Sequence, residues 1–173
     1  MSELHKPVML AEVLKYLNPK ENGIYVDGTF GTGGHSRAIL AKIKTGKLIA
    51  FEWDPKEIEL VCQDKFFSSA NFFLINDNFV NLEKHLLALN ILEADGFLFD
   101  LGLSSYHLAS EERGFSYRSN SPLDMRINQN NKINAEEIIN NYSQEKLADI
   151  FYHYGEERKA RIIAKKICRQ RQK

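Results

Sequence analysis

The stretch DGTFGTGGHS, residues 27–36, joins an acidic residue to four glycines, and it lies between an apolar run and a helical pattern. Glycine lets a backbone approach a ligand closely and adopt positive φ angles. Gly28, Gly31, Gly33 and Gly34 therefore allow successive N–H groups to point at an anionic group. The alternative is a merely tight turn. The density of glycines directly after an apolar run favours the ligand-binding loop.

Two departures from known nucleotide loops narrow the choice of ligand. The dinucleotide pattern GxGxxG fails because Ser36 stands where the third glycine belongs, and no GK[ST] of a phosphate-binding loop follows. Glu52 lies 19 positions after Gly33, where a carboxylate can accept hydrogen bonds from both hydroxyls of an adenosine ribose. S-adenosylmethionine has a carboxylate for the glycine N–H groups, and an ammonium and a sulfonium that favour Asp27 and Asp100. The glycines and the three acids therefore predict one pocket for this cofactor.

Apolar runs alternate with amphipathic helical patterns along residues 1–100. Continuous apolar strands separated by amphipathic helices indicate a parallel sheet that is covered on both faces. Ligands of such sheets bind beyond the carboxyl ends of the strands, which is where the glycine stretch and the three acids lie. We expect strands within 23–28, 47–53, 71–76 and 94–101, and helices over 7–17, over 36–43 and through Leu82, Leu86 and Leu89.

The helix start after the second strand has a distinct signature. Asp54 can cap the helix, Pro55 suits its first position, and Glu57 occupies the third position, as in a capping box. Ile58 and Val61 begin the apolar stripe beyond it. These residues predict a helix that begins at Pro55.

The pattern changes after the fourth strand. Residues 101–133 are rich in Ser, Asn, Gly and Arg and lack sustained periodicity, which predicts a long functional loop. Three helical patterns follow, over 135–141, over 144–154 and from Glu156 onward, with Gly155 as the terminator between the last two.

Charge and composition limit the classes of function. The 23 Lys and Arg balance 23 Asp and Glu, so no global field steers the chain onto nucleic acid. Residues 1–100 carry 10 basic against 14 acidic side chains, whereas residues 101–173 carry 13 against 9, which makes the second part the one to meet an anion. Ordinary solvated surfaces are the alternative.

Cysteine spacing and hydropathy add four expected absences. Cys62 and Cys168 lie far apart, with no CxxC and no histidine at metal-ligand spacing, which argues against a disulfide framework and against a metal site. No window approaches the roughly 20 apolar residues of a membrane span, and the N-terminus lacks the order of a secretion signal. We therefore predict a cytoplasmic protein without a membrane partner.

Six motifs occur along the chain in a distinctive order and spacing: HKPVMLAEVL, YVDGTFGTGGHSRAIL, DPKEIE, FDLGLSS, ERGFSYRSNSPLDMR and YGEERKARIIAKKI. DGTFGTGGHS and ERGFSYRSNSPLDMR are the most specific sequences among them. Together they resemble, in order and spacing, the RsmH (MraW) family of bacterial small-subunit ribosomal RNA methyltransferases, and the resemblance covers nearly the whole chain.

The resemblance implies an activity and a set of cofactor contacts. A Rossmann-like class I methyltransferase of this family transfers a methyl group from S-adenosylmethionine to the exocyclic N4 amino group of a cytidine. Its implied role is rRNA processing, with small-subunit ribosomal RNA or the assembled small subunit as partner. Glu52 stands where aspartate is common, and His107 where glutamine is usual. The cofactor contacts of the family fall on Gly33, Gly34, His35, Glu52, Phe79, Asp100 and His107.

Methyltransferases of this class normally have seven strands, whereas this chain supplies four, in the order 3-2-1-4 by analogy. The fourth strand would then be an edge with unpaired backbone groups and apolar side chains. We therefore expect a missing C-terminal portion and an incomplete sheet. Residues 1–106 would form the N-terminal part of the cofactor-binding α/β domain, 107–133 a substrate-side loop, and 134–173 the start of an inserted helical subdomain.

Methylation of an amino group needs an acceptor and a clamp for the base. Asp100, or a nearby carbonyl of Asp-Leu-Gly-Leu, is the predicted catalytic acceptor for one N–H. Many amino methyltransferases carry [DN]PP[YF] at this point, but this chain has DLGL, so the clamp must come from elsewhere. The predicted substrate residues are Arg113, Phe115, Tyr117 and Arg126, whose rings could stack on a base and whose guanidinium groups could meet phosphates; the alternative is that both rings pack the loop down.

Three functions of different kinds remain open at this stage. The first is an active ribosomal RNA methyltransferase. The second is a truncated, non-catalytic fragment of that enzyme that binds the cofactor or RNA. The third is a nicotinamide-dependent oxidoreductase, which the missing third glycine disfavours.

Overall fold

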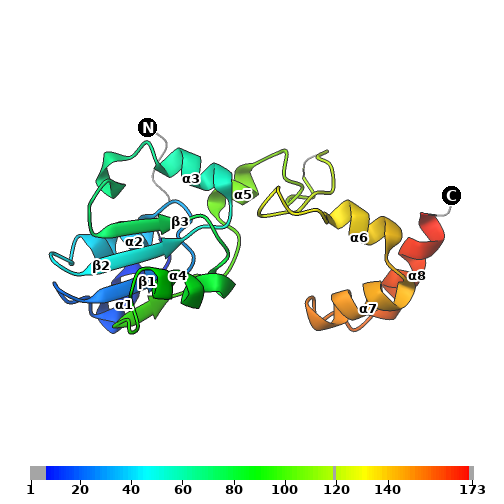
Figure 1. The fold of residues 1–173 in the computed structure, drawn as a ribbon. Helices are drawn as coiled ribbons and strands as arrows, with labels where there is room; N and C mark the ends of the chain where they lie inside the picture. The colour runs from blue at the N-terminus through cyan, green and yellow to red at the C-terminus, as the bar shows by residue number, and fades with distance from the viewer. Residues whose placement is uncertain (1–6, 119, 172–173) are drawn as a thin grey trace. The chain divides into compact units, whose positions relative to one another are not determined.

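The computed structural model describes residues 7–118 and 120–171, in two units of which one ends at Ala109 and the other begins at Ser110. Figure 1 shows the order of the elements along the chain. His5, Lys6 and Ser119, which belong to two of the motifs quoted above, lie outside the described residues.

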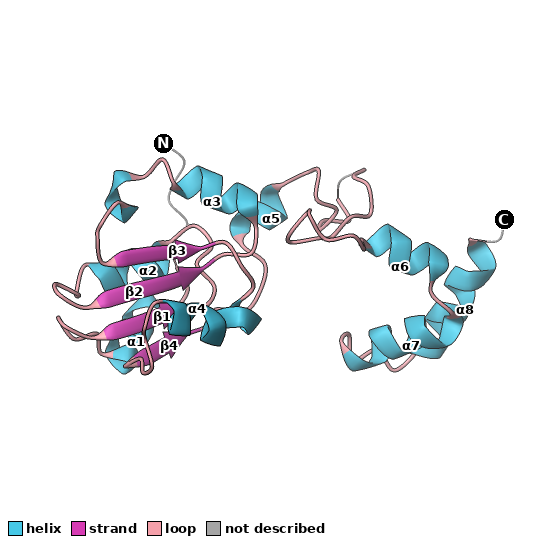
Figure 2. Cartoon of the chain, viewed as in Figure 1, coloured by secondary structure: helices cyan, strands magenta, loops and turns pink. Residues whose placement is uncertain are grey.

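Four parallel strands form the sheet of the first unit, in the order β3-β2-β1-β4 (Figure 2). In the register of this sheet, Asp27 of β1 lies opposite Ala50 of β2 and Leu98 of β4. The Rossmann-like α/β class and the strand order predicted from the sequence are therefore confirmed. The strands are β1 (Ile24–Asp27), β2 (Lys47–Phe51), β3 (Phe72–Ile75) and β4 (Gly96–Leu98).

Helices cover both faces of this sheet. Alternate residues of the central strands point to opposite sides, so each face carries apolar side chains that a helix must cover. Tyr25 and Leu48 pack with Ile39 of α2 on one face. Val26 packs with Leu86 of α4 on the other face. The helices of the first unit are α1 (Leu10–Leu17), α2 (Gly34–Leu40), α3 (Pro55–Val61), α4 (Leu82–Ala88) and α5 (Ser105–Ala109), and the short 3-10 helices are η1 (Lys65–Phe67) and η2 (Phe79–Asn81).

The start of α3 follows the predicted capping pattern only in part. The Asp54 side chain accepts a hydrogen bond from the backbone N–H of Lys56 at 3.0 Å, and Pro55 occupies the first turn, as predicted. The expected contribution of Glu57 is wrong. The backbone N–H of Asp54 donates instead to Glu52 at 2.8 Å, so the side chain of Glu57 is released for a different contact.

The predicted loop after β4 contains a helix that the sequence analysis missed. In α5 the Ser104 hydroxyl oxygen accepts from the backbone N–H of His107 at 3.2 Å, which caps the first turn. A helix of five residues presents too little periodicity to be recognised in a sequence.

Three helices end the second unit: α6 (Ala135–Asn141), α7 (Gln144–His153) and α8 (Ala160–Gln170). Leu147 and Ala164 are fully buried between α7 and α8. The end of α7 differs from the prediction, because the left-handed residue is Glu156, at φ 51°, rather than Gly155. The irregular segment that follows delays the start of α8 to Ala160.

Candidate functional site

The glycine stretch forms a tight loop between β1 and α2. Gly31 and Gly33 have φ angles of +54° and +79°, which favour glycine. A Cβ atom on Gly33 would lie 2.6 Å from the Phe67 ring and 2.8 Å from the Phe30 ring. Both the backbone conformation and the close packing therefore require glycine at Gly33.

Asp27, at the end of β1, holds this loop in place. Its carboxylate accepts hydrogen bonds from the backbone N–H of Thr29 at 3.1 Å and from the Ser36 hydroxyl at 2.7 Å. The side chain is 1% exposed, and this burial raises the pKa of Asp27 above its ordinary value. Asp27 thus joins the end of β1 to the first turn of α2 across the glycine loop.

Glu52 holds the same loop from the neighbouring strand. One carboxylate oxygen accepts from the backbone N–H of Gly31 and the other from that of Asp54, both at 2.8 Å. Each carboxylate oxygen has a second lone pair, so the group can still accept hydrogen bonds from a ligand. The extra methylene of glutamate is compatible with this double contact, and the side chain is 7% exposed.

His35 and Asp100 lie near each other beyond β1 and β4. The His35 Nε2 atom donates to the carbonyl of Val8 at 2.9 Å, and its Nδ1 atom lies 4.0 Å from the Asp100 carboxylate. The backbone N–H of Asp100 donates to the Thr29 hydroxyl at 2.7 Å. The Asp100 side chain is 47% exposed, in contrast to buried Asp27 and Glu52, so it is the predicted acid most open to a ligand.

Phe79 lies in η2, which follows β3. Its ring meets the ring of Phe99 edge to face, with 5.4 Å between the centroids. Gly28 makes room for Phe99, because a Cβ atom on Gly28 would come within 2.3 Å of that ring. The aromatic pair is thereby attached to the start of the glycine loop.

His107 belongs to a buried network that the sequence analysis did not identify. Its Nε2 atom lies 3.0 Å from the Asp54 carboxylate, and its Nδ1 atom lies 3.0 Å from the Ser104 hydroxyl. That hydroxyl also donates to the carboxylate of Glu57. The signal available in the sequence is the run of three acids in EWDPKE directly after an apolar strand, which is dense for a helix start.

The predicted substrate residues lie in one loop of the second unit, and the two arginines among them point inward. Arg113 is 1% exposed and donates to the backbone carbonyls of Arg126 and Ile127 at 3.0 and 2.9 Å. Arg126 binds the Asp124 carboxylate in a fork at 2.9 and 2.6 Å, which holds the pKa of Asp124 below its usual value.

The aromatic residues of this loop differ in exposure. The Tyr117 side chain is 94% exposed, whereas Phe115 is partly buried. In the described part of the loop, Tyr117 is therefore the better placed of the two rings to stack on a base.

The seven predicted cofactor residues all belong to the first unit. Gly33, Gly34 and His35 follow β1, Glu52 follows β2, Phe79 follows β3, and Asp100 and His107 follow β4. Since the carboxyl ends of parallel strands meet at one edge of a sheet, these residues share that edge. A hydrogen bond joins Glu52 to the glycine loop, and His35 lies near Asp100.

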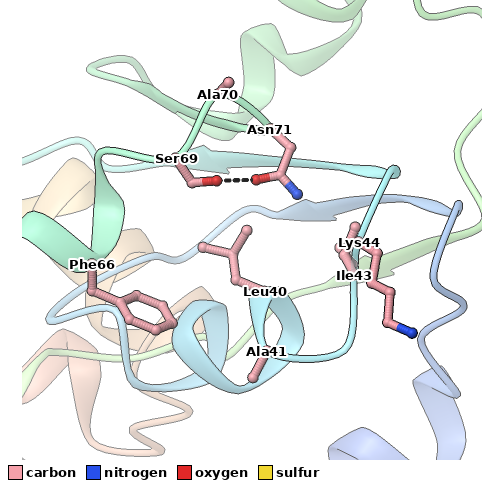
Figure 3. A pocket seen from close by; sticks show the side chains of 8 residues that line it. All are labelled: Leu40, Ala41, Ile43, Lys44, Phe66, Ser69, Ala70 and Asn71. Atoms are coloured by element: carbon pink, nitrogen blue, oxygen red, sulfur yellow. Dashed lines mark hydrogen bonds between the residues drawn. The ribbon is translucent and has the colours of Figure 1, made fainter.

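A surface pocket of about 410 Å³ lies elsewhere in the first unit (Figure 3). It is next to the C-terminal end of α2 and the residues before β3, and none of the predicted site residues lines it. Within the described ranges, no group of His, Cys, Asp and Glu is arranged to hold a metal ion, and no helix has the length and apolar character to cross a membrane. The lining residues are Leu40, Ala41, Ile43, Lys44, Phe66, Ser69, Ala70 and Asn71.

Curated proteins named ribosomal RNA small subunit methyltransferase H are similar to this chain. The protein of Mesoplasma florum is 48% identical over 170 residues, which are 98% of this chain and 55% of the relative. The protein of Endomicrobium trichonymphae is also 48% identical over 170 residues and is covered to 58% of its length. The chain thus spans little more than half the length of these relatives.

A crystal structure of an rRNA methylase from Streptococcus thermophilus is also similar, at 27% sequence identity and a TM-score of 0.35. The match covers 44% of this chain and 42% of that protein.

The model of the MraW methylase family matches residues 2–173. This match includes the glycine loop, the acids that follow the strands and the loop of the second unit. The chain therefore belongs to the MraW methylase family.

Proposed function

We propose that this chain forms the cofactor-binding part of an S-adenosylmethionine-dependent methyltransferase that modifies the N4 amino group of a cytidine in small-subunit ribosomal RNA. The observation that carries the proposal is the fixed glycine loop with three acids at the carboxyl edge of the sheet, in a member of the MraW methylase family. The cytidine specificity follows from the family resemblance.

The donor set of the site fits S-adenosylmethionine. The loop that contains Gly33 and Gly34 can offer backbone N–H groups to the carboxylate of the cofactor. Glu52 can still accept a hydrogen bond from the ribose, and half-exposed Asp100 can meet a cationic group. Phe79, His35 and His107 complete the proposed set of contacts.

Asp100 is the proposed acceptor for a hydrogen of the target amino group. S-adenosylmethionine supplies an electrophilic methyl group when it is bound. The amino lone pair of cytosine is delocalised into its ring, and an acceptor for one N–H localises that pair. Asp100 suits this role because its side chain is exposed and its backbone is fixed to Thr29.

The loop of the second unit is the proposed substrate contact. Arg113 and Arg126 hold its backbone, so we propose that they shape the loop, with phosphate contact as a secondary role. Exposed Tyr117 would stack on a base, a contact that contributes about 1 to 3 kcal/mol. Phe115 remains in the proposed set as a second ring.

A binding fragment without turnover is the second candidate function. The observation that favours it is the exposed edge strand β4 and the segment directly after it, in which Phe97, Phe99 and Leu101 are 46%, 41% and 73% exposed. Because β4 is the edge of the described sheet, these apolar groups lie in water. Cofactor or RNA binding could then persist without catalysis.

A methylation assay on small-subunit particles separates these two functions. The chain is incubated with methyl-labelled S-adenosylmethionine, and the RNA is digested to nucleosides. Labelled N4-methylcytidine, lost in Asp100→Asn, is expected for the enzyme. A folded chain that binds S-adenosylmethionine and gives no labelled nucleoside would leave only the binding fragment.

A further inference from the structure

Glu57 is a buried acid to which neither the family resemblance nor the proposed function assigns a role. It lies in the first turn of α3 and is 1% exposed. One carboxylate oxygen accepts from the Ser104 hydroxyl, whereas the other, Oε2, is buried without a hydrogen-bond partner. A buried oxygen left in this state is costly if the carboxyl group is ionised.

The surroundings of Glu57 offer it no compensating positive charge. The acids that face it are Glu52 and Asp54, and the nearby His107 is engaged by Asp54 and Ser104. In the described part of the chain, no Lys or Arg forms an ion pair with Glu57. Burial first, and then the like charges of Glu52 and Asp54, raise the pKa of Glu57 to about 7.

The Oε2 atom of Glu57 faces Gly31 of the glycine loop. A Cβ atom on Gly31 would lie 3.8 Å from it, and the Glu52 carboxylate accepts the backbone N–H of the same Gly31 at 2.8 Å, so both carboxyl groups lie at this residue. Two ionised carboxylates cannot form a hydrogen bond with each other, but a single proton turns one of them into a donor. Both oxygens of Glu52 already accept backbone N–H groups, whereas Oε2 of Glu57 is buried without a partner, so the proton belongs on Glu57.

We propose that Glu57 is a neutral carboxylic acid that donates its hydrogen to Glu52 and thereby positions Glu52 for the cofactor ribose. The positioning role rests on the proposed function, because that function assigns the ribose to Glu52. The donated hydrogen holds the Glu52 carboxylate against Gly31 while it keeps a single negative charge. Ionisation of Glu57 would place a second charge against Glu52 and loosen this contact.

The first test needs no ligand and follows thermal unfolding against pH. A group whose pKa is higher in the folded state stabilises the fold below its unfolded pKa and loses that contribution as pH rises through its folded pKa. The wild-type melting temperature, measured relative to that of Glu57→Gln, should therefore fall from pH 4.5 to about 7 and then level off. If the melting temperatures of the two proteins change with pH in parallel, Glu57 does not share a proton with Glu52.

The second test measures the dissociation constant of S-adenosylhomocysteine, which lacks the sulfonium charge, from pH 6 to pH 8.5. Wild-type affinity should fall by about threefold or more over this range, because Glu57 loses its proton and no longer holds Glu52 in place for the ligand. Glu57→Gln, which stays neutral and can still donate, should retain affinity and lose the pH dependence. Glu59→Gln, an exposed change on the same helix, should behave as wild type.

The outcomes separate the two levels of inference. Equal pH dependence of binding in wild type and Glu57→Gln would overturn the positioning role while leaving cofactor binding intact. Binding by no variant at any pH would contradict the proposed function, and the unfolding curves would still decide on the shared proton. If Glu57→Gln fails to fold, the pH dependence of the carboxyl carbon-13 chemical shift of Glu57 in the wild type decides instead. A titration midpoint near the ordinary glutamate pKa of about 4.3 would overturn the proposal.

Discussion

Glu52 is the residue with the most direct predicted effect on cofactor binding. Substitution Glu52→Gln removes the negative charge and places an amide donor against one of two backbone N–H groups. A hydrogen bond to a charged group contributes about 1.5 to 3 kcal/mol, so the affinity for S-adenosylmethionine should fall by about ten- to a hundredfold. Calorimetric titration measures this change, and unchanged affinity would exclude Glu52 as a contact. Glu59→Gln is the matched control.

Tyr117 should affect RNA binding without affecting stability. Its ring is 94% exposed, so Tyr117→Ala should change the free energy of unfolding by less than about 0.5 kcal/mol. The loss of one stacked base should weaken binding to a small-subunit RNA fragment by about 1 to 3 kcal/mol. Filter binding at fixed salt checks the second value. A variant that binds RNA as wild type does would remove Tyr117 from the substrate contacts.

For single residues, the sequence identified those whose partners lie close to them along the chain. The glycines, Asp27 and Asp54 were recognisable because turn and cap chemistry is local. Ser104 and Glu57 were not, because their contact joins positions 47 residues apart. The inward direction of Arg113 was equally invisible, since an arginine in a polar loop has the same sequence signature whether it binds phosphate or backbone carbonyls.

The glycine loop should tolerate no side chain at its junction with α2. Gly33→Ala would force a residue with a Cβ atom to φ +79° and into contact with Phe67 and Phe30. We expect a lower melting temperature and a loss of S-adenosylmethionine binding, with a destabilisation of about 1 to 3 kcal/mol. Thr32→Ala in the same loop is the control. A Gly33→Ala protein with wild-type melting and affinity would contradict the loop geometry.

The loop of the second unit should depend on Arg113 for its structure. Arg113→Ala leaves the carbonyls of Arg126 and Ile127 without their donor and opens a buried space. The free energy of unfolding should fall by about 3 kcal/mol or more. Arg118→Ala, an exposed change nearby, should have little effect. Denaturant unfolding distinguishes the two variants, and equal stability would show that Arg113 does not hold the loop.

Regular elements were more predictable than their boundaries. The four strands and most of the helices followed from apolar periodicity, because a covered parallel sheet imposes it, whereas the order of the strands came from analogy with the family. The first turn of α2 was placed two residues late, since glycine in a helix start gives no apolar signal. The start of α8 was placed at Glu156 because periodicity continues through the irregular turn before Ala160.

At the scale of the whole molecule, the exposed edge of β4 predicts self-association. Apolar side chains and unpaired backbone groups on an edge strand favour edge-to-edge contact. Sedimentation velocity should show concentration-dependent association that Phe97→Lys reduces. Tyr16→Lys, which also replaces an exposed aromatic residue by lysine but lies on α1, should leave the association unchanged. A monomer at every concentration would contradict this prediction.

The central claim is that the glycine loop and the acids at the strand ends enclose a cationic nucleoside and not a dinucleotide. Calorimetric titration of the chain with S-adenosylmethionine, and separately with NAD, tests it most directly. We predict saturable binding of S-adenosylmethionine at one site, weakened in Glu52→Gln, and no binding of NAD. Binding of NAD, or a folded chain that binds neither compound, would contradict the claim.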